Sequence, residues 1–227
     1  RPLPKAGDGG PGKDDLCIYT VDARDGRPEG LSRLGSKDGG KIWSKAEPVR
    51  IEWGEGEHGN AVDPSVVQLP DGTLRLYFLS MPRPEGPVPL DPSLPGGFPP
   101  LQPLPGTEPR QPEKSPRPDR PRVPVPEERG QDRIKHAIYS AVSGDGLVFK
   151  VEEGTRLQEE RVTDPEVVKA GDEWFMFLSR GQEVLLARSD DGLEWRKDKS
   201  FILRGGGVPG ALALSDGRVR VYQSSPE

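Results

Sequence analysis

The sequence is poor in cysteine, histidine and positive charge, and each shortage excludes a class of protein. The single cysteine, Cys17, rules out a disulfide bond within the 227-residue chain. The two histidines, His58 and His136, lie too far apart to suggest the spacing of metal ligands, so neither a metal nor a cofactor is expected. The formal net charge of −5 leaves no basic field that could hold nucleic acid.

The sequence also lacks long apolar runs and a helical pattern. No apolar run approaches the ~18–20 residues that a membrane-spanning helix needs, so no membrane span is expected. No stretch repeats its apolar residues with the 3.6-residue period of a helix, so almost no helix is expected either. Only 32% of the residues are hydrophobic, but these residues are concentrated in a few segments. Those segments are therefore the places to look for a core.

Proline is unevenly distributed. More than half of the 27 prolines lie between Pro82 and Pro126. Because proline lacks the backbone N–H and has a fixed φ, this stretch suits neither a helix nor a strand interior. We interpret 82–130 as a disordered or polyproline-II insertion, with a ligand for a proline-binding module or a flap over a site as the alternatives. With a flexible N-terminus at 1–14, this leaves a single interrupted domain over 15–227.

The remaining segments repeat. Residues 61–79, 162–178 and 207–223 align, and each contains an apolar strand that opens near a proline, a turn with Gly and Asp, and an alternating strand. This pattern predicts a hairpin. Third and fourth strands follow in two of the repeats, which gives a period of ~40–50 residues. The sequence thus predicts an all-β protein whose four-stranded antiparallel blades are typical of a β-propeller.

The predicted strands do not add up to a closed propeller. Two complete blades are expected, 61–81 continued by 134–158, and 162–204. The C-terminal part offers two strands, and the N-terminal part offers three, at 17–23, 30–36 and 47–53. Because a propeller usually needs at least four blades, we expect a partial or atypical one. Its unpaired strand edges would favour association, and the oligomeric state is left open.

One small turn occurs three times, in "LGSKDGGKIW" (34–43), "AVSGDGLVF" (141–149) and "ARSDDGLEW" (187–195). In each turn, serine and aspartate oxygens can accept hydrogen bonds from turn N–H groups, and the glycine allows a positive φ. The aromatic residue can fold back over the turn as an apolar plug. The expected role is therefore structural for Ser36, Asp38, Trp43, Ser143, Asp145, Phe149, Ser189, Asp191 and Trp195, rather than catalysis or Ca²⁺ binding.

These turns carry a resemblance to a known family. "SKDGGKIW" (36–43) matches the Asp-box, or bacterial neuraminidase repeat, S-x-D-x-G-x-x-W, and the other two turns resemble a shortened form. The segments that begin "DPSVV" and "DPEVV" look like inner strands of five-bladed propellers in the arabinanase–invertase and sialidase-like glycoside hydrolases. The resemblance implies a five-bladed propeller, a carbohydrate ligand, and a secreted or periplasmic location. It also implies a base at Asp63 and an acid-tuning carboxylate at Asp164.

The inner strands should meet at the propeller axis, which makes Asp63 and Asp164 the candidate catalytic residues. Glycoside hydrolysis needs two carboxyl groups, one ionised and one that holds a proton. The third inner strand opens with Val208-Pro209 and offers no carboxylate. The candidate substrate-binding residues are Glu57, His58, Arg161 and Glu166, with Trp53 as a possible stacking platform. Two functions stay open, a glycoside hydrolase and a non-catalytic propeller that binds carbohydrate or protein. A third reading is an interaction protein that works through 82–130.

Overall fold

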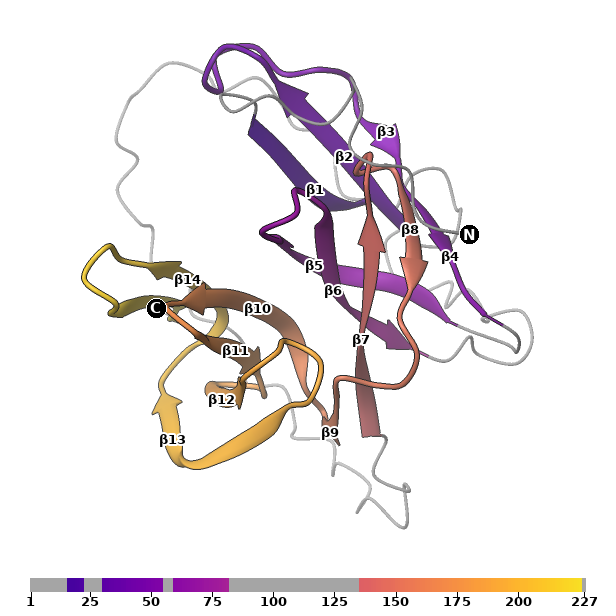
Figure 1. The fold of residues 1–227 in the computed structure, drawn as a ribbon. Coiled ribbons are helices and arrows are strands. Elements are labelled where there is room, and N and C mark those ends of the chain that lie inside the picture. The colour runs from indigo at the N-terminus through magenta and orange to yellow at the C-terminus, as the bar shows by residue number, and fades with distance from the viewer. Residues whose placement is uncertain (1–15, 23–29, 55–58, 82–134, 226–227) are drawn as a thin grey trace, which may run out of the picture. The chain divides into compact units, whose positions relative to one another are not determined.

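The computed structural model describes residues 16–22, 30–54, 59–81 and 135–225, and every regular element in these ranges is a β-strand (Figure 1). The predicted insertion at 82–130 and the N-terminal residues 1–14 lie outside the described residues. The all-β prediction is therefore confirmed for the described part of the chain.

The strands form four sheets, and within each sheet nearly all neighbours are antiparallel. The first sheet has the order β1-β2-β3, with β1 (Leu16–Asp22), β2 (Gly30–Ser36) and β3 (Glu47–Pro48). The second has the order β4-β8-β7-β6-β5, with β4 (Arg50–Glu52), β5 (Asn60–Gln68), β6 (Leu74–Met81), β7 (Lys135–Ser143) and β8 (Val148–Val151), while β9 (Leu157–Glu160) also pairs with β7. The third has the order β10-β11-β12-β13, with β10 (Thr163–Ala170), β11 (Glu173–Ser179), β12 (Glu183–Ser189) and β13 (Arg196–Arg204). The fourth pairs β14 (Gly207–Ala213) with β15 (Val219–Ser224).

The three aligned repeats form the hairpins β5–β6, β10–β11 and β14–β15, as predicted. Their turns contain Gly72, Gly171 and Gly217, at φ values of 87°, 63° and 82°. These values lie in the left-handed region, where glycine meets no steric penalty. The sheet β10–β13 is a complete four-stranded antiparallel unit. The number of blades stays a prediction.

The predicted strand at 47–53 is divided in two. Glu47–Pro48 pairs with β2, whereas Arg50–Glu52 pairs in parallel with β8 of the next sheet. Pro48 has no N–H to donate, so the ladder along β2 cannot continue regularly through it. After one more bond, from Val49 N–H to the Leu31 carbonyl, the Arg50 N–H bonds to the Leu147 carbonyl instead. The second sheet is therefore larger than the four strands that the repeat predicted.

Three apolar clusters join successive sheets. One contains Leu31 with Leu76, Phe78 and Phe149, and it joins the first sheet to the second. Another combines residues of the second sheet, such as Tyr77 and Leu79, with Met176 and Leu178 of the third. The last cluster joins Phe177, Val184 and Leu186 of the third sheet to Ala211, Val219 and Val221 of the fourth.

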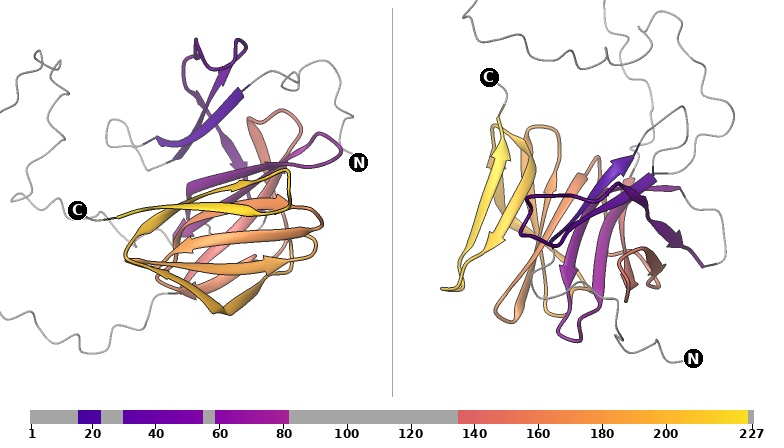
Figure 2. Two further views of the ribbon diagram at one scale, coloured as in Figure 1. Left: turned by 90° about the vertical axis from the view of Figure 1, so that its left-hand side faces the viewer. Right: turned by 90° about the horizontal axis from the view of Figure 1, so that it is seen from above.

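The inner strands of the second, third and fourth sheets are neighbours. Strand β10 packs against β5 on one side and against β14 on the other, and the views of the hairpin β14–β15 beside the third sheet agree (Figure 2). Residues that lie ~45–100 positions apart in the sequence are thereby brought side by side.

Candidate functional site

The three inner strands begin with the same unusual backbone geometry. Asp63, Asp164 and Val208 have φ values of 52°, 49° and 47°, and each is followed by proline. In each hairpin the pairing register shifts at this point, which marks a β-bulge. Aspartate enters the left-handed region with little difficulty, but a β-branched valine does so only under strain. The geometry therefore belongs to this position of the strand and not to one residue type.

This geometry brings the two predicted catalytic residues together. The backbone N–H of Asp164 donates to Oδ2 of Asp63 at 3.3 Å, although the two residues lie 101 positions apart. The hydroxyl of Thr163 donates to Oδ2 of Asp164 at 2.7 Å. Both aspartates are half-buried. The start of β5 thus brings the Asp63 carboxylate against the backbone of Asp164 at the start of β10.

A second row of contacts lies two residues further along the same strands. Oγ of buried Ser65 accepts the Val167 N–H at 2.9 Å and lies 3.3 Å from Oε2 of Glu166. The other oxygen of Glu166 accepts the Ala211 N–H of β14 at 3.2 Å. Burial raises the pKa of Glu166, although the hydrogen bonds from Ala211 and Ser65 oppose the rise. Both oxygens are engaged by neighbouring strands, so Glu166 connects β5, β10 and β14.

The third inner strand lacks the carboxylate. The N–H of Val208 donates to Oγ of Ser179 at 2.5 Å, where the N–H of Asp164 meets an aspartate. Strand β14 contains no acidic residue. At the strand position where β5 and β10 carry aspartate, β14 therefore carries Val208 and no acid.

The other predicted site residues have different surroundings. Arg161 is exposed, with φ 55°, in the turn between β9 and β10. Glu57 and His58 lie outside the described residues. Glu173 pairs with Arg188 at 2.8 Å and lies at the far end of the β10–β11 hairpin, so it is no substitute for a third acid at the strand starts. Among the described residues, no group of three or more His, Cys, Asp or Glu could hold a metal ion.

Trp53 and His136 have packing roles. The half-buried Trp53 ring meets Phe78 and Tyr139 edge-on, with centroid distances of 5.5 Å and 5.2 Å, so it packs against the core, and its use as a stacking platform stays a prediction. Nδ1 of His136 lies 2.7 Å from the Val162 carbonyl and donates to it. This bond holds the segment that leads into Asp164.

The repeated turns form the hydrogen bonds that the sequence predicts. We call 36–43, 143–149 and 189–195 the Ser–Asp turns. In each turn the serine hydroxyl donates to the aspartate at 2.8–3.0 Å, and Oδ1 of the aspartate accepts two backbone N–H groups. The N–H of Ile42 is the main cause that holds the pKa of Asp38 below its usual value, and the N–H of Glu194 does the same for Asp191. Oδ1 of each aspartate is therefore occupied within its own turn.

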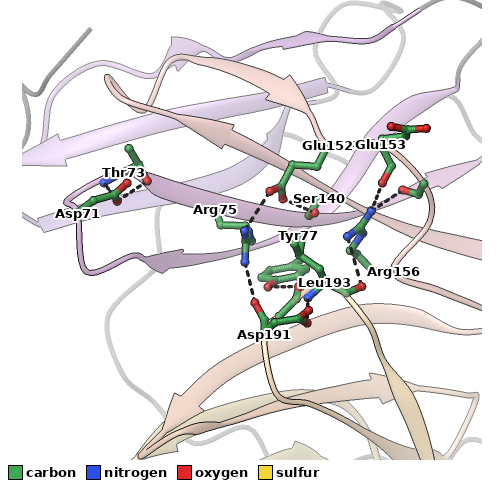
Figure 3. Close-up of polar contacts among 12 residues, drawn as sticks. Asp71, Thr73, Arg75, Tyr77, Ser140, Glu152, Glu153, Arg156, Asp191 and Leu193 are labelled. Atoms are coloured by element: carbon green, nitrogen blue, oxygen red, sulfur yellow. Dashed lines mark hydrogen bonds and ion pairs between the residues drawn. The ribbon is translucent and has the colours of Figure 1, made fainter. Parts of the chain in front are cut away.

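Two Ser–Asp turns are also held from the preceding sheet, by contacts that sequence reasoning missed. The Tyr77 hydroxyl donates to the Gly192 carbonyl at 2.8 Å, and Arg75 donates to the Asp191 carbonyl at 3.2 Å (Figure 3). Arg75 is braced by Glu152 at 3.0 Å. We call such a Tyr–Arg pair a clamp.

The first sheet holds the turn 143–149 in the same way. Tyr19 donates to the Gly146 carbonyl at 2.9 Å and Arg33 to the Asp145 carbonyl at 2.8 Å. Burial raises the pKa of Tyr19 to about 12, so its hydroxyl stays protonated as a donor. The repeated occurrence of tyrosine and arginine opposite a Gly-containing turn was the available sequence signal. The sequence alone does not show which turn each tyrosine and arginine contacts, because the bonded residues lie 112–127 positions apart.

Solved structures of glycoside hydrolases share this arrangement of strands. A thermostable family-43 glycoside hydrolase matches with a TM-score of 0.57 and 14% identity, covering 92% of this chain and 61% of that one. A xylan β-1,4-xylosidase from Bacillus halodurans C-125 matches with a TM-score of 0.51 and 12% identity, over 94% and 35%. A GH32 β-fructofuranosidase from Bombyx mori matches with a TM-score of 0.50 and 17% identity, over 93% and 39%.

These matches show a likeness of fold to β-propeller enzymes. The chain spans less than two thirds of the length of each of these three proteins. No family model and no curated protein matches the sequence. In the described part of the chain, no helix is long and apolar enough to cross a membrane.

Proposed function

We propose that this protein is a glycoside hydrolase of the β-propeller type that acts on glycans through Asp63 and Asp164. The observation that carries the proposal is the 3.3 Å contact between the Asp164 N–H and the Asp63 carboxylate. This contact, between the starts of two neighbouring inner strands, supports a shared site for the two half-buried aspartates. The shared fold with family-43 and GH32 enzymes supports the same reading.

The contacts suggest different roles for the two aspartates. Asp63 accepts a backbone N–H, and we assign it the role of base or nucleophile. Asp164 accepts the Thr163 hydroxyl, and we assign it the role of the carboxylate that tunes the acid. Arg161, exposed just before β10, is retained as a substrate-binding candidate, and Glu57 and His58 remain candidates from the sequence. Glu166 was also a substrate-binding candidate, but both of its oxygens are used between strands, and we assign it to holding the inner strands together.

One observation favours a second function. Val208 occupies the position of the aspartates on the third inner strand, and no acid replaces it on β14. A propeller that binds glycan without cleaving it would need no third acid. The two functions differ in whether Asp63 and Asp164 control turnover.

The test is hydrolysis of a panel of aryl glycosides (arabinofuranoside, xyloside, fucoside, mannoside and sialoside). Asp63→Asn and Asp164→Asn should each lower kcat by about 10²–10⁴-fold, the usual range for removal of an acid or base. Val208→Asn is the matched control, because it changes the equivalent position without removing a carboxylate. Circular dichroism checks that each variant is folded. A folded wild type that hydrolyses none of the substrates would overturn the hydrolase proposal, and a glycan-binding array would then test the second function.

A further inference from the structure

The last hairpin carries a third clamp. In the second sheet, Tyr77 pairs with Ser65 and Arg75 pairs with Val67. In the fourth sheet, Tyr222 pairs with Gly210 and Arg220 pairs with Leu212. Ser65 and Gly210 each lie two residues after the left-handed residue of their strand. Tyr222 and Arg220 therefore occupy the strand positions of Tyr77 and Arg75.

The third clamp is exposed. Tyr77 is fully buried, with 0% of its surface accessible, whereas Tyr222 is 56% exposed. Arg220 is also exposed, and Leu212 beside it is 52% exposed. Strand β15 has β14 as its one neighbour in the described sheets. The clamp at β15 thus faces outward with the same two side chains that elsewhere hold a Ser–Asp turn.

The first Ser–Asp turn, 36–43, lacks a Tyr–Arg pair among the described residues. The turn 36–43 makes the same internal bonds as the others, with the Gly40 N–H on Ser36 Oγ at 2.9 Å and the Trp43 indole N–H on the Gly40 carbonyl at 3.0 Å. Gly40 therefore corresponds to Gly146 and Gly192. Those two glycines are buried beneath their clamps, while Gly40 is only half-buried.

The same turn also shows an open surface. Ile42 is 75% exposed. Within the described ranges, neither a tyrosine nor an arginine of another strand bonds to this turn. The chain therefore carries one exposed clamp and one Ser–Asp turn that no described clamp holds.

We propose that Arg220 and Tyr222 form a docking site for the Ser–Asp turn 36–43 of a second copy of this chain. The Tyr222 hydroxyl would donate to the Gly40 carbonyl, and the Arg220 guanidinium would donate to the preceding carbonyl, that of Gly39. This is the contact that the molecule already makes twice within itself. Among the described strands, β1 and β15 each have one neighbour, and strand edges of this kind favour association. The contact is heterologous, because different surfaces of the two copies meet.

The first experiment measures self-association by sedimentation velocity over about 1–300 µM. The wild type should show concentration-dependent dimers or larger species. Tyr222→Phe should weaken association about 5-fold, and the double variant Arg220→Gln/Tyr222→Phe by more than 10-fold, as expected for one and two hydrogen bonds. Thermal unfolding of the dilute monomer should not change, since both side chains are exposed. Tyr77→Phe is the matched control, because it should lower stability and leave association unchanged.

The second experiment tests the turn. A Cβ placed on Gly146 would meet the Tyr19 hydroxyl at 2.6 Å, and one on Gly192 would meet the Tyr77 hydroxyl at 2.7 Å. Gly40→Ala should therefore block docking. Gly39→Ala is its control, because Gly39 also has a positive φ, 73°, and a Cβ there meets nothing within 4 Å.

Mixing completes the test. A Gly40→Ala chain keeps its clamp, and a Tyr222→Phe/Arg220→Gln chain keeps its turn, so an equimolar mixture should recover dimers that neither variant forms alone. A wild type that is monomeric up to about 300 µM would overturn the proposal. Association that the clamp variant leaves unchanged would overturn it too. These readouts measure mass and do not depend on glycosidase activity.

Discussion

The contact between β5 and β10 and the contact between β10 and β14 share one backbone plan but differ in chemistry. In both, the left-handed residue before proline donates its N–H to the preceding sheet. The acceptor is the Asp63 carboxylate in the first contact and the Ser179 hydroxyl in the second. Val208 adopts the strained conformation without any acidic side chain. Strain at this position therefore reflects how an inner strand begins, and only the carboxylates distinguish a candidate active site from a structural contact.

The largest loss of stability should come from replacing Glu166, because its carboxylate bonds to both β5 and β14. Glu166→Ala would leave the Ala211 N–H and the Ser65 hydroxyl without their partner, and an unsatisfied buried donor costs about 1–3 kcal/mol. We expect the free energy of unfolding to fall by about 2–3 kcal/mol in urea titrations. Glu166→Gln is the control, because its amide oxygen can still accept the Ala211 N–H. Equal losses in both variants would show that the hydrogen bond is not the cause.

Ser179→Ala should weaken the second contact alone. Ser179 is buried and accepts the Val208 N–H, so its removal should cost about 1–2 kcal/mol of unfolding free energy. Ser224→Ala is the control on the β14–β15 hairpin. It removes an exposed hydroxyl that donates to the Gly207 carbonyl, and it should cost less than about 0.5 kcal/mol. If the two losses were the same, the Ser179 contact would not support the start of β14.

Val208→Asn should stabilise the protein by about 1 kcal/mol. Asparagine tolerates the left-handed region in which valine is strained. Thermal and urea unfolding would measure the gain, with Leu212→Asn as a control on the same strand, where no left-handed residue is relieved. A loss of stability would show that the valine side chain contributes more by packing than it costs by strain.

The smallest expected effect is on the pH dependence of stability. Because burial raises the pKa of Glu166, the folded state holds this proton more tightly than the unfolded chain does. Its contribution is fully present below the ordinary value of 4.5 and is lost as the pH rises through the raised pKa. The stability of the wild type relative to Glu166→Gln should therefore fall as the pH rises above 4.5. A relative stability that is constant or rises over this range would contradict the prediction.

Local patterns were predictable from the sequence. The alternating strands and Gly-containing turns predicted the hairpins, and the spacing of serine, aspartate and aromatic residues predicted the bonds inside the Ser–Asp turns. The alignment of repeats also placed Asp63 and Asp164 at equivalent positions. These features depend on backbone preferences over a few residues and on the repetition of one pattern.

Features that depend on the neighbouring sheet could not be predicted. Nothing near Trp53 indicates that its ring packs against Tyr139, and nothing near Pro48 shows that the chain changes sheets there. The engagement of Glu166 by Ser65 and Ala211 likewise requires three strands to be in register. Strand alternation along β10 does not indicate which groups would meet the Glu166 side chain.

The sequence by itself determined the all-β architecture, the hairpins and the Ser–Asp turns, because these follow from φ preferences, alternation and hydrogen bonds between residues a few positions apart. The tertiary structure decided which carboxylate meets which N–H, which turns are held by a clamp, and which clamp is left exposed at β15. Those outcomes depend on contacts between sheets, where residues about 100 positions apart in the sequence come within hydrogen-bond distance.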